Sequence, residues 1–320
     1  MPANSLRMSI DEILDEFATL PYPVSDEIQT VGSALLGSHV AWPNPLVLER
    51  SVETLSTKKK KADKILIKES SINKMSSLPP SLIALYYVME KLFKSSRGLQ
   101  LPIDTELFGV EISLWIVERD LIPFCNMEPI TGSSIVAYVF HLYRNMNKDQ
   151  AGKFLFVNPF TISHSSKLSI EDRARALSER LLLTTANQIV LAPCNVDSHW
   201  ILTVIVPHKG HVYMFDSLYN RIRDVSWKAA VDNAMSIYNA NKGKKFKNSA
   251  KWETIKAPKQ PDGTKCGFFV MRYMKEIVQG FEKDANISLP SLFTNVQYSQ
   301  VEIDEVREEW AKCVLTHVLD

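Results

Sequence analysis

Three side chains in this sequence carry the groups that nucleophilic acyl transfer requires. They are the thiol of Cys266, the imidazole of His199 and the carboxylate of Asp216. A thiol becomes a strong nucleophile when a neighbouring imidazole takes its proton. A carboxylate beside the imidazole selects its tautomer and stabilises its charged form. The three residues therefore form a candidate triad if the fold brings them together.

The imidazole and the carboxylate lie at the ends of two predicted strands, residues 200–206 and 211–215, which flank the turn Pro207-His208-Lys209-Gly210. Residues that differ by two positions face the same side of a strand. Antiparallel pairing across this even-length turn makes Asp216 a diagonal cross-strand neighbour of His199. The pattern predicts a contact between these two side chains, whereas a turn of odd length would separate them.

Cys266 follows a turn-rich segment, residues 260–264, and precedes an apolar run with helical spacing. The apolar residues that fit the helical stripe are Phe269, Met274, Ile277 and Val278. A thiol at a helix N-terminus is next to unpaired N–H groups and the positive end of the helix dipole, which favour thiolate. Lys265 adds positive charge there, and the Gln260 amide can donate to a developing oxyanion beside the Cys266 N–H.

Each of these residues taken alone is uninformative, because a lone cysteine is usually a small buried hydrophobe. Several other cysteines and histidines fit such simple roles. Cys194, on a strand, and Cys313, in a helix, are expected to be core residues, as are His141 and His317. His208 and His211 are expected to be solvated residues beside a turn. The case for chemistry rests on the combined geometry.

The composition is that of an ordinary globular protein of 320 residues, with 45% apolar residues, 23% charged residues and a net charge of +1. Such a charge gives no reason to expect nucleic acid or a membrane as partner. No apolar run is long enough for a membrane span, and the N-terminus lacks a signal-peptide core. The four widely spaced cysteines show no CxxC pair, so we expect free thiols in an intracellular protein of the nucleus or cytoplasm.

Residues 1–98 are predicted to form an N-terminal extension, and residues 99–320 a catalytic domain. The extension is expected to contain a short helix (Ile10–Leu20), a loop that includes Ala41–Pro45, a Lys-rich linker (Ser56–Lys64) and a helix from Ser81 to Lys94 that opens at Pro79-Pro80. The Lys-rich run is interpreted as a solvated linker, with a nuclear-import signal as the alternative.

The remaining residues mix strands and helices without regular βαβ alternation, which indicates an α+β fold. Helices are predicted over residues 133–143, 169–182, 225–240 and 303–318, and strands over 188–192, 200–206, 211–215 and 252–255.

The residues around the candidate triad resemble the Ulp1-type ubiquitin-like protease family, papain-like cysteine peptidases that process SUMO and related modifiers. The resemblance rests on Ser198-His199-Trp200, Phe215-Asp216-Ser217 and the segment Gln260 to Gly267 (QPDGTKCG). The spacings of 17 residues from His to Asp, 50 from Asp to Cys and six from Gln to Cys agree with the family. The segments 124–128 (FCNME) and 303–310 (IDEVREEW) look like plant members, many of which are associated with transposable elements.

The resemblance implies a papain-like fold with a central mixed or antiparallel sheet, and a role for each matching residue. Cys266 would attack the carbonyl after the C-terminal glycine of the modifier. His199 would act as base and then as acid, Asp216 would orient it, and Gln260 would line the oxyanion hole. Trp200 would bind substrate by packing near the channel that admits the di-glycine tail, or could equally be a core anchor. The partner would be a SUMO-like or other ubiquitin-like modifier with its conjugates. The protein would be a monomer, and it would need no cofactor or metal.

Two positions depart from the family pattern. SUMO-cleaving members carry a tryptophan ahead of the first catalytic-domain helix that covers the di-glycine channel, and the corresponding stretch here, Pro123 to Pro129, has none. The residue before the nucleophile is often acidic in the family, whereas here it is Lys265. Both departures bear on the choice of substrate.

Three other functions remain open on the sequence alone. One is a catalytically silent, transposon-associated relative that binds a ubiquitin-like protein. Another is a cysteine acyltransferase, since some use the same order of histidine, acid and cysteine, although no acyl-donor pocket or basic patch is evident. The third is a structural or DNA-associated module, which the near-neutral charge and the lack of a zinc or helix-turn-helix signature disfavour.

Overall fold

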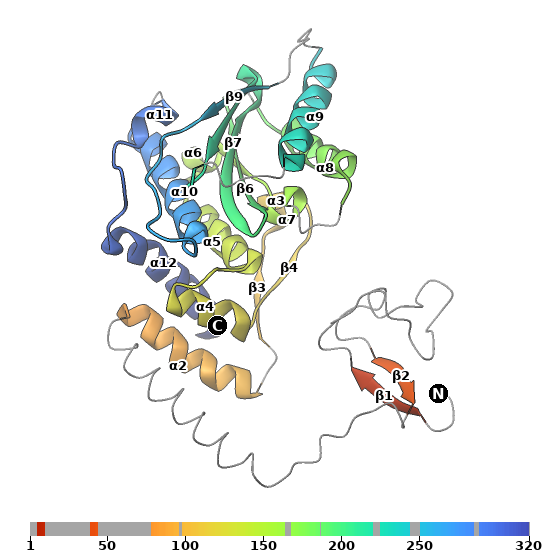
Figure 1. Cartoon of the computed structure of the whole chain (residues 1–320), viewed down its shortest axis with the longest axis vertical. Coiled ribbons are helices and arrows are strands. Elements are labelled where there is room, and N and C mark those ends of the chain that lie inside the picture. Colours follow the sequence, from red (N-terminus) through yellow and green to blue (C-terminus); the bar gives the residue numbers. More distant parts are fainter. Residues whose placement is uncertain are drawn as a thin grey trace. The chain divides into compact units, whose positions relative to one another are not determined.

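The structure is a computed structural model of the 320-residue chain. It describes residues 5–9, 39–43, 78–95, 98–163, 168–185, 187–219, 225–243, 250–284 and 288–319. The chain divides into two compact units, Met1–Asn73 and Lys74–Asp320 (Figure 1). The larger unit contains every residue of the candidate triad.

The smaller unit contains a two-stranded antiparallel sheet of β1 (Ser5–Ser9) and β2 (His39–Pro43). The loop predicted over Ala41–Pro45 is therefore wrong for its first three residues. They lie in β2 because pairing with β1 satisfies their backbone groups, which local composition does not predict. The helix predicted over Ile10–Leu20 and the Lys-rich run Ser56–Lys64 lie outside the described residues.

The larger unit is built on a five-stranded sheet with the strand order β5-β6-β7-β8-β9. Its strands are β5 (Phe154–Phe156), β6 (Ile189–Val196), β7 (His199–Val206), β8 (His211–Phe215) and β9 (Lys251–Thr254). The three central strands are antiparallel, and each outer strand is parallel to its neighbour. This mixed sheet with helices on both faces confirms the α+β prediction.

Helices cover the two faces of this sheet (Figure 1). The long ones are α2 (Pro80–Ser95), α5 (Gly132–Asn145), α8 (Ile170–Leu182), α9 (Ser226–Asn241), α10 (Cys266–Lys283) and α12 (Gln300–Leu319). The shorter elements are β3 (Leu99–Pro102), α3 (Thr105–Phe108), β4 (Ser113–Ile116), α4 (Glu118–Asn126), α6 (Lys148–Ala151), α7 (Pro159–Ile162), η3 (Pro207–Lys209) and α11 (Leu289–Leu292). Within the described ranges, no helix combines the length and the apolar run that crossing a bilayer would take.

Alternate residues of β7 face the two helical layers, as the two-residue period of a strand requires. Leu202 and Val204 belong to the core that α5, α10 and α12 share. Ile201 and Ile205 belong to a second core beneath α8 and α9. Helices cover both faces of β7, and a strand that is buried on both faces needs apolar residues at nearly every position. The apolar sequence of β7 therefore agrees with its place in the centre of the sheet.

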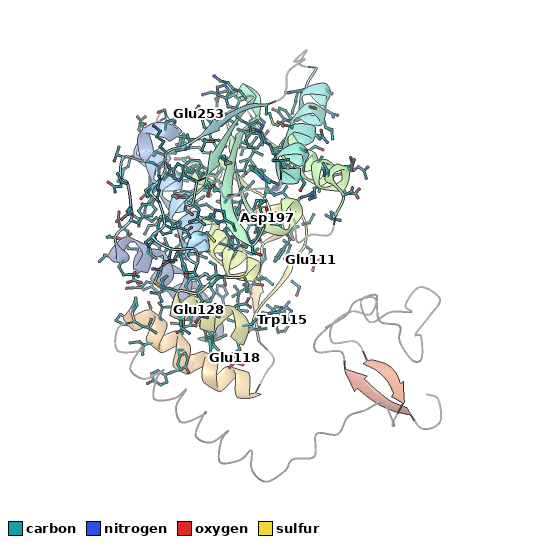
Figure 2. All side chains as sticks on the ribbon, in the orientation of Figure 1. Glu111, Trp115, Glu118, Glu128, Asp197 and Glu253 are labelled. Atoms are coloured by element: carbon teal, nitrogen blue, oxygen red, sulfur yellow. The ribbon has the colours of Figure 1, made fainter. Side chains whose placement is uncertain are left out.

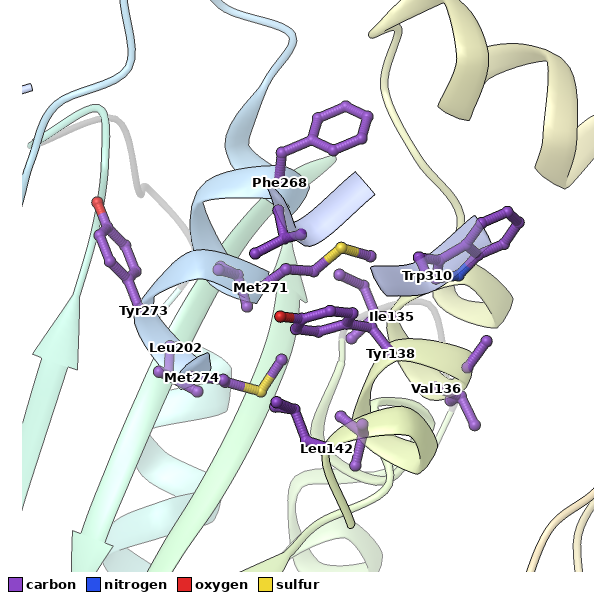
Figure 3. Close-up of a cluster of buried hydrophobic side chains, with 14 of the residues drawn as sticks. Ile135, Val136, Tyr138, Leu142, Leu202, Phe268, Met271, Tyr273, Met274 and Trp310 are labelled. Carbon is purple, nitrogen blue, oxygen red and sulfur yellow. The ribbon is translucent and has the colours of Figure 1, made fainter. Parts of the chain in front are cut away.

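Helix α10 passes through the larger core, and Figure 3 shows its contacts with α5 and α12. Figure 3 draws Met271 of α10 next to Ile135 of α5, and the rings of Phe268 of α10 and Trp310 of α12 each contact the ring of Phe124. The sequence predicted a single apolar stripe for this helix, but most of its first three turns is buried. A helix enclosed between a sheet and other helices is apolar on most sides, so a one-sided pattern underestimates its burial.

Helix α2 belongs to the larger unit, although the sequence placed it in the N-terminal extension that ends at residue 98. Leu82, Leu85 and Met89 of this helix are fully buried in the core that includes α12. The helix needs that contact because it would otherwise expose an apolar stripe. The contacts divide the chain between Asn73 and Lys74 instead.

Candidate active site

The hairpin of β7 and β8 has the register that the sequence predicted, with Val206 opposite His211. Beyond the last pair of this ladder, Nε2 of His199 lies 2.7 Å from Oδ1 of Asp216. Both side chains are buried. The predicted contact between imidazole and carboxylate is therefore present, and it follows from the even length of the turn.

His199 owes its position to a two-residue turn between β6 and β7. Val196 and His199 pair across this turn, and its central residues Asp197 and Ser198 have φ angles of 50° and 61°. Positive φ at both positions is what a type I′ hairpin turn requires. Asp197 is labelled in Figure 2 and is exposed, so the turn lies at the surface beside the buried histidine.

The environment of His199 favours the protonated imidazole. Burial lowers the pKa of His199, but the hydrogen bond with Asp216 and the nearby Cys266 sulfur outweigh burial and raise it to about 9. Burial raises the pKa of Asp216, yet hydrogen bonds from His199 and from the Leu218 amide keep it below its ordinary value. Since Asp216 occupies Nε2, Nδ1 is the nitrogen left for the thiol. It is buried and has no hydrogen-bond partner among the residues that the structure describes.

Cys266 is the first residue of α10, as the sequence predicted. The backbone N–H of Trp200 donates to its Sγ at 3.4 Å. This N–H and the helix N-terminus place partial positive charge beside the sulfur. Cys266 and His199 are each 3% exposed, so both reacting groups are buried.

Lys265 contributes less positive charge to the site than the sequence suggested. Its ammonium group pairs with Oδ2 of Asp262 at 3.0 Å. The same carboxylate accepts hydrogen bonds from the backbone and side chain of Thr264 through Oδ1. Asp262 thus compensates the charge of Lys265 and organises the loop that leads into α10.

Gln260 is buried on this loop, and two partners hold its side-chain amide. Its Oε1 accepts a hydrogen bond of 2.5 Å from Oγ of Ser217, and its Nε2 donates to the carbonyl oxygen of Asp262. An amide nitrogen carries two hydrogens, so one N–H remains for an oxyanion.

Trp200 is a buried anchor in this structure, being 4% exposed. Its indole N–H donates to the carbonyl oxygen of Ile130 at 3.0 Å. A side chain on Gly267 would collide with the Ile130 side chain and lie 3.3 Å from the indole ring. These contacts agree with the role of a core anchor, and the substrate-binding role of Trp200 stays a prediction.

The stretch Pro123–Pro129, which corresponds to the tryptophan-bearing segment of the family, directly precedes Ile130. Most of that stretch belongs to α4, where Phe124 stacks on Trp310 with a ring-centroid distance of 4.0 Å. Ile130 is the residue ahead of α5 that reaches Gly267. Phe124 and Ile130 both belong to the larger core.

All four cysteines are free. Burial raises the pKa of Cys125 and of Cys313 to about 11. Cys194 is buried and its Sγ donates to a backbone carbonyl. The histidines predicted to be solvated, His208 and His211, are half-buried because the turn between β7 and β8 packs on its neighbours.

Two functional neighbours were missed at the sequence level. Ser217 directly follows Asp216 and belongs to the motif Phe215-Asp216-Ser217, but no role was predicted for its hydroxyl. Ile130 gave no local signal, because its contact with Gly267 joins residues far apart in the chain.

The arrangement combines a thiol at a helix start, an imidazole held by a carboxylate, and an amide with a spare N–H. In an α+β fold of this kind, these groups define a papain-like cysteine peptidase. The model of the Ulp1 protease family, C-terminal catalytic domain, matches residues 136–317. Because this match spans more than half of the 320 residues, the chain belongs to the Ulp1 protease family.

Solved structures of this family are similar to the chain. The SUMO protease Ulp1 with its catalytic cysteine oxidized to a sulfinic acid has 16% identity, covers 76% of this chain and 98% of its own, and gives a TM-score of 0.50. The Ulp1 domain in complex with Smt3, the yeast ortholog of SUMO, has 17% identity, coverages of 74% and 95%, and a TM-score of 0.48.

The Xanthomonas campestris effector XopD bound to ubiquitin has 20% identity, coverages of 58% and 91%, and a TM-score of 0.41. No curated protein sequence matches the chain. The likeness to oxidized Ulp1 supports the papain-like fold.

Proposed function

We propose that this protein is a cysteine peptidase that hydrolyses the peptide or isopeptide bond after the C-terminal glycine of a SUMO-like or other ubiquitin-like modifier. The observation that carries the proposal is the position of His199, which contacts Asp216 and lies beside the sulfur of Cys266. Membership of the Ulp1 protease family supports the same reaction class.

Each step of this reaction has a group to perform it. Nδ1 of His199 accepts the thiol proton while Sγ of Cys266 bonds to the glycine carbonyl carbon. The carbonyl oxygen becomes an oxyanion that the free N–H of Gln260 and the Cys266 amide stabilise. The imidazolium then gives its proton to the leaving amine, and the C–N bond breaks to leave a thioester. Water attacks the thioester, His199 accepts its proton, and the thiol is released.

The burial of the site supports a glycine tail as substrate. Cys266 and His199 are each 3% exposed, and Trp200 and Ile130 pack beside Gly267. A glycine tail has no side chains, so it is the narrowest peptide segment that could approach so little exposed a thiol. An extended glycine tail is the feature that ubiquitin-like modifiers share, so the burial of the thiol favours them over general peptide substrates.

A panel of electrophilic probes built on ubiquitin and several ubiquitin-like proteins tests the proposal. We expect the wild-type protein to form a covalent adduct with at least one probe, and Cys266→Ala to form none. His199→Ala is expected to lose labelling too, because the thiol then has no base. No adduct with any probe would contradict the peptidase and favour a silent binding module. Full hydrolysis by Cys266→Ala would exclude this nucleophile.

We also propose an intracellular location and a plant, transposon-associated origin. Free cysteines support the intracellular location, since a reducing compartment keeps thiols unpaired. The segments 124–128 and 303–310 support the plant, transposon-associated origin. Microscopy of the tagged protein in plant cells tests the location, and a signal restricted to the secretory pathway would contradict it.

A further inference from the structure

We infer that Ser217 is a positioning residue, whose hydroxyl orients the Gln260 amide so that an N–H of that amide points to the developing oxyanion. This inference rests on the proposed function and assigns a role within the same site. Ser217 is 1% exposed and directly follows Asp216. It is therefore held by the strand end that also carries the carboxylate of the triad.

Ser217 holds Gln260 at two points. The carbonyl oxygen of Ser217 accepts the backbone N–H of Gln260 at 3.1 Å, which anchors the loop. The hydroxyl of Ser217 donates to Oε1 of Gln260 at 2.5 Å, which anchors the side chain. The first bond survives any substitution of the side chain, so the second can be removed by itself.

The two partners of the Gln260 amide allow only one orientation. The carbonyl oxygen of Asp262 can only accept a hydrogen bond, so it must face Nε2. Oε1 must then face Ser217, which supplies the donor. A flipped amide would place two oxygen atoms against each other at Asp262. Without the hydroxyl, Oε1 would be a buried acceptor with no donor, and rotation of the amide would cost less.

The same hydroxyl lies where three parts of the site meet. Ser217 is at the end of β8, Gln260 is on the loop before α10, and Tyr273 is on α10 itself. The Tyr273 hydroxyl donates to the carbonyl oxygen of Pro258 at 2.5 Å, on the loop that carries Gln260. In Figure 3 the Tyr273 ring points away from α5, on the opposite side of α10. A buried network thus joins the strand of Asp216 to the helix that starts at Cys266.

Comparison of two reactions of the same thiol tests this role. Hydrolysis of C-terminal aminocoumarin amides of ubiquitin and SUMO passes through an oxyanion, whereas alkylation by iodoacetamide does not. We expect Ser217→Ala to lower kcat for hydrolysis about tenfold, less than the 10²–10³-fold effect of removing an oxyanion donor itself. The KM and the rate and pH profile of alkylation should not change. Ser217→Thr, which keeps the hydroxyl, should restore kcat.

Ser178→Ala is the matched control, because Ser178 is also a buried serine whose hydroxyl donates, here to the carbonyl oxygen of Arg175 on α8. It should leave both reactions unchanged. Unchanged hydrolysis in Ser217→Ala would overturn the inference. An equal fall of hydrolysis and alkylation would also overturn it, because Ser217 would then act through His199 or through general stability.

A second measurement does not need turnover. The side-chain amide of Gln260 gives a pair of NMR signals, assigned by their absence in Gln260→Glu. We expect one ordered pair in the wild-type protein and shifted, broadened signals in Ser217→Ala. Identical signals in both proteins would overturn the inference. If the wild-type protein does not hydrolyse either amide, the proposed function fails for those modifiers, and the NMR result still decides the role of Ser217.

Discussion

Nε2 of His199 and Oδ1 of Asp216 lie 2.7 Å apart at the ends of neighbouring antiparallel strands, and both side chains are buried. The Leu218 amide donates to the same Oδ1 atom at 2.9 Å, which fixes the carboxylate. A hydrogen bond to an ionised group in a buried site is strong and directional. This contact holds the imidazole in place, with Nδ1 left for the thiol.

Asp216→Ala is expected to lower kcat more than Asp216→Asn does. The asparagine carbonyl can still accept the Nε2 hydrogen of His199 and the Leu218 amide, whereas alanine supplies no acceptor. We expect losses on the order of 10³-fold or more for alanine, and smaller losses for asparagine, in steady-state hydrolysis of a ubiquitin-like aminocoumarin amide. Equal losses would mean that the charge of Asp216 matters and its geometry does not.

The stability of the folded protein should fall at alkaline pH because of His199. Its pKa is raised from 6.5 to about 9, so the folded state favours the protonated imidazole. The resulting stabilisation is complete below pH 6.5 and is lost as the pH rises through about 9. In urea titrations we expect the free energy of unfolding to fall by up to about 3 kcal/mol more in the wild-type protein than in His199→Gln. Parallel curves for the two proteins would contradict a raised pKa.

Iodoacetamide at neutral pH should modify Cys266 before the other cysteines. The pKa values of Cys125 and Cys313 are raised to about 11 by burial, so almost none of either is thiolate. We expect a rate at least about tenfold higher for Cys266, followed by mass spectrometry of peptides. Cys266→Ser should lack this fast phase, and His199→Ala should slow it. Alkylation of Cys313 as fast as Cys266 would show that the site does not activate its thiol.

Gly267→Ala should destabilise the protein by about 1–3 kcal/mol, because the new Cβ overlaps the side chain of Ile130. Gly152→Ala is a suitable control, since a Cβ there meets only backbone oxygen atoms at 3.6 Å, an ordinary contact. Urea midpoints of both variants provide the comparison. If Gly267→Ala is as stable as the control, Ile130 does not pack against the residue after the thiol.

Much of the site was determined by local sequence. The even turn between residues 206 and 211 sets the register of a two-strand hairpin, and that register alone puts Asp216 beside His199. The turn-rich segment before Cys266 ends where a helix can begin. The position of Cys266 at the start of α10 could therefore be predicted from the local sequence as well. The helix predicted over residues 169–182 corresponds to α8, and the hydroxyl of Ser169 caps it by accepting the N–H of Asp172. Each of these relations is set by residues close together in the chain.

Other features depended on contacts between residues far apart in the chain. The sequence did not predict the hydrogen bond from the Trp200 indole to the carbonyl oxygen of Ile130, which anchors this side chain. Two other features also depend on residues far apart in the chain. They are the hydrogen bond between Ser217 and Gln260 and the burial of α2 against α12. Periodicity and turn chemistry report the neighbours along one segment, whereas these contacts form only when separate segments pack into one core. The amino-acid sequence therefore indicated which groups could react, and tertiary packing decided what surrounds and orients them.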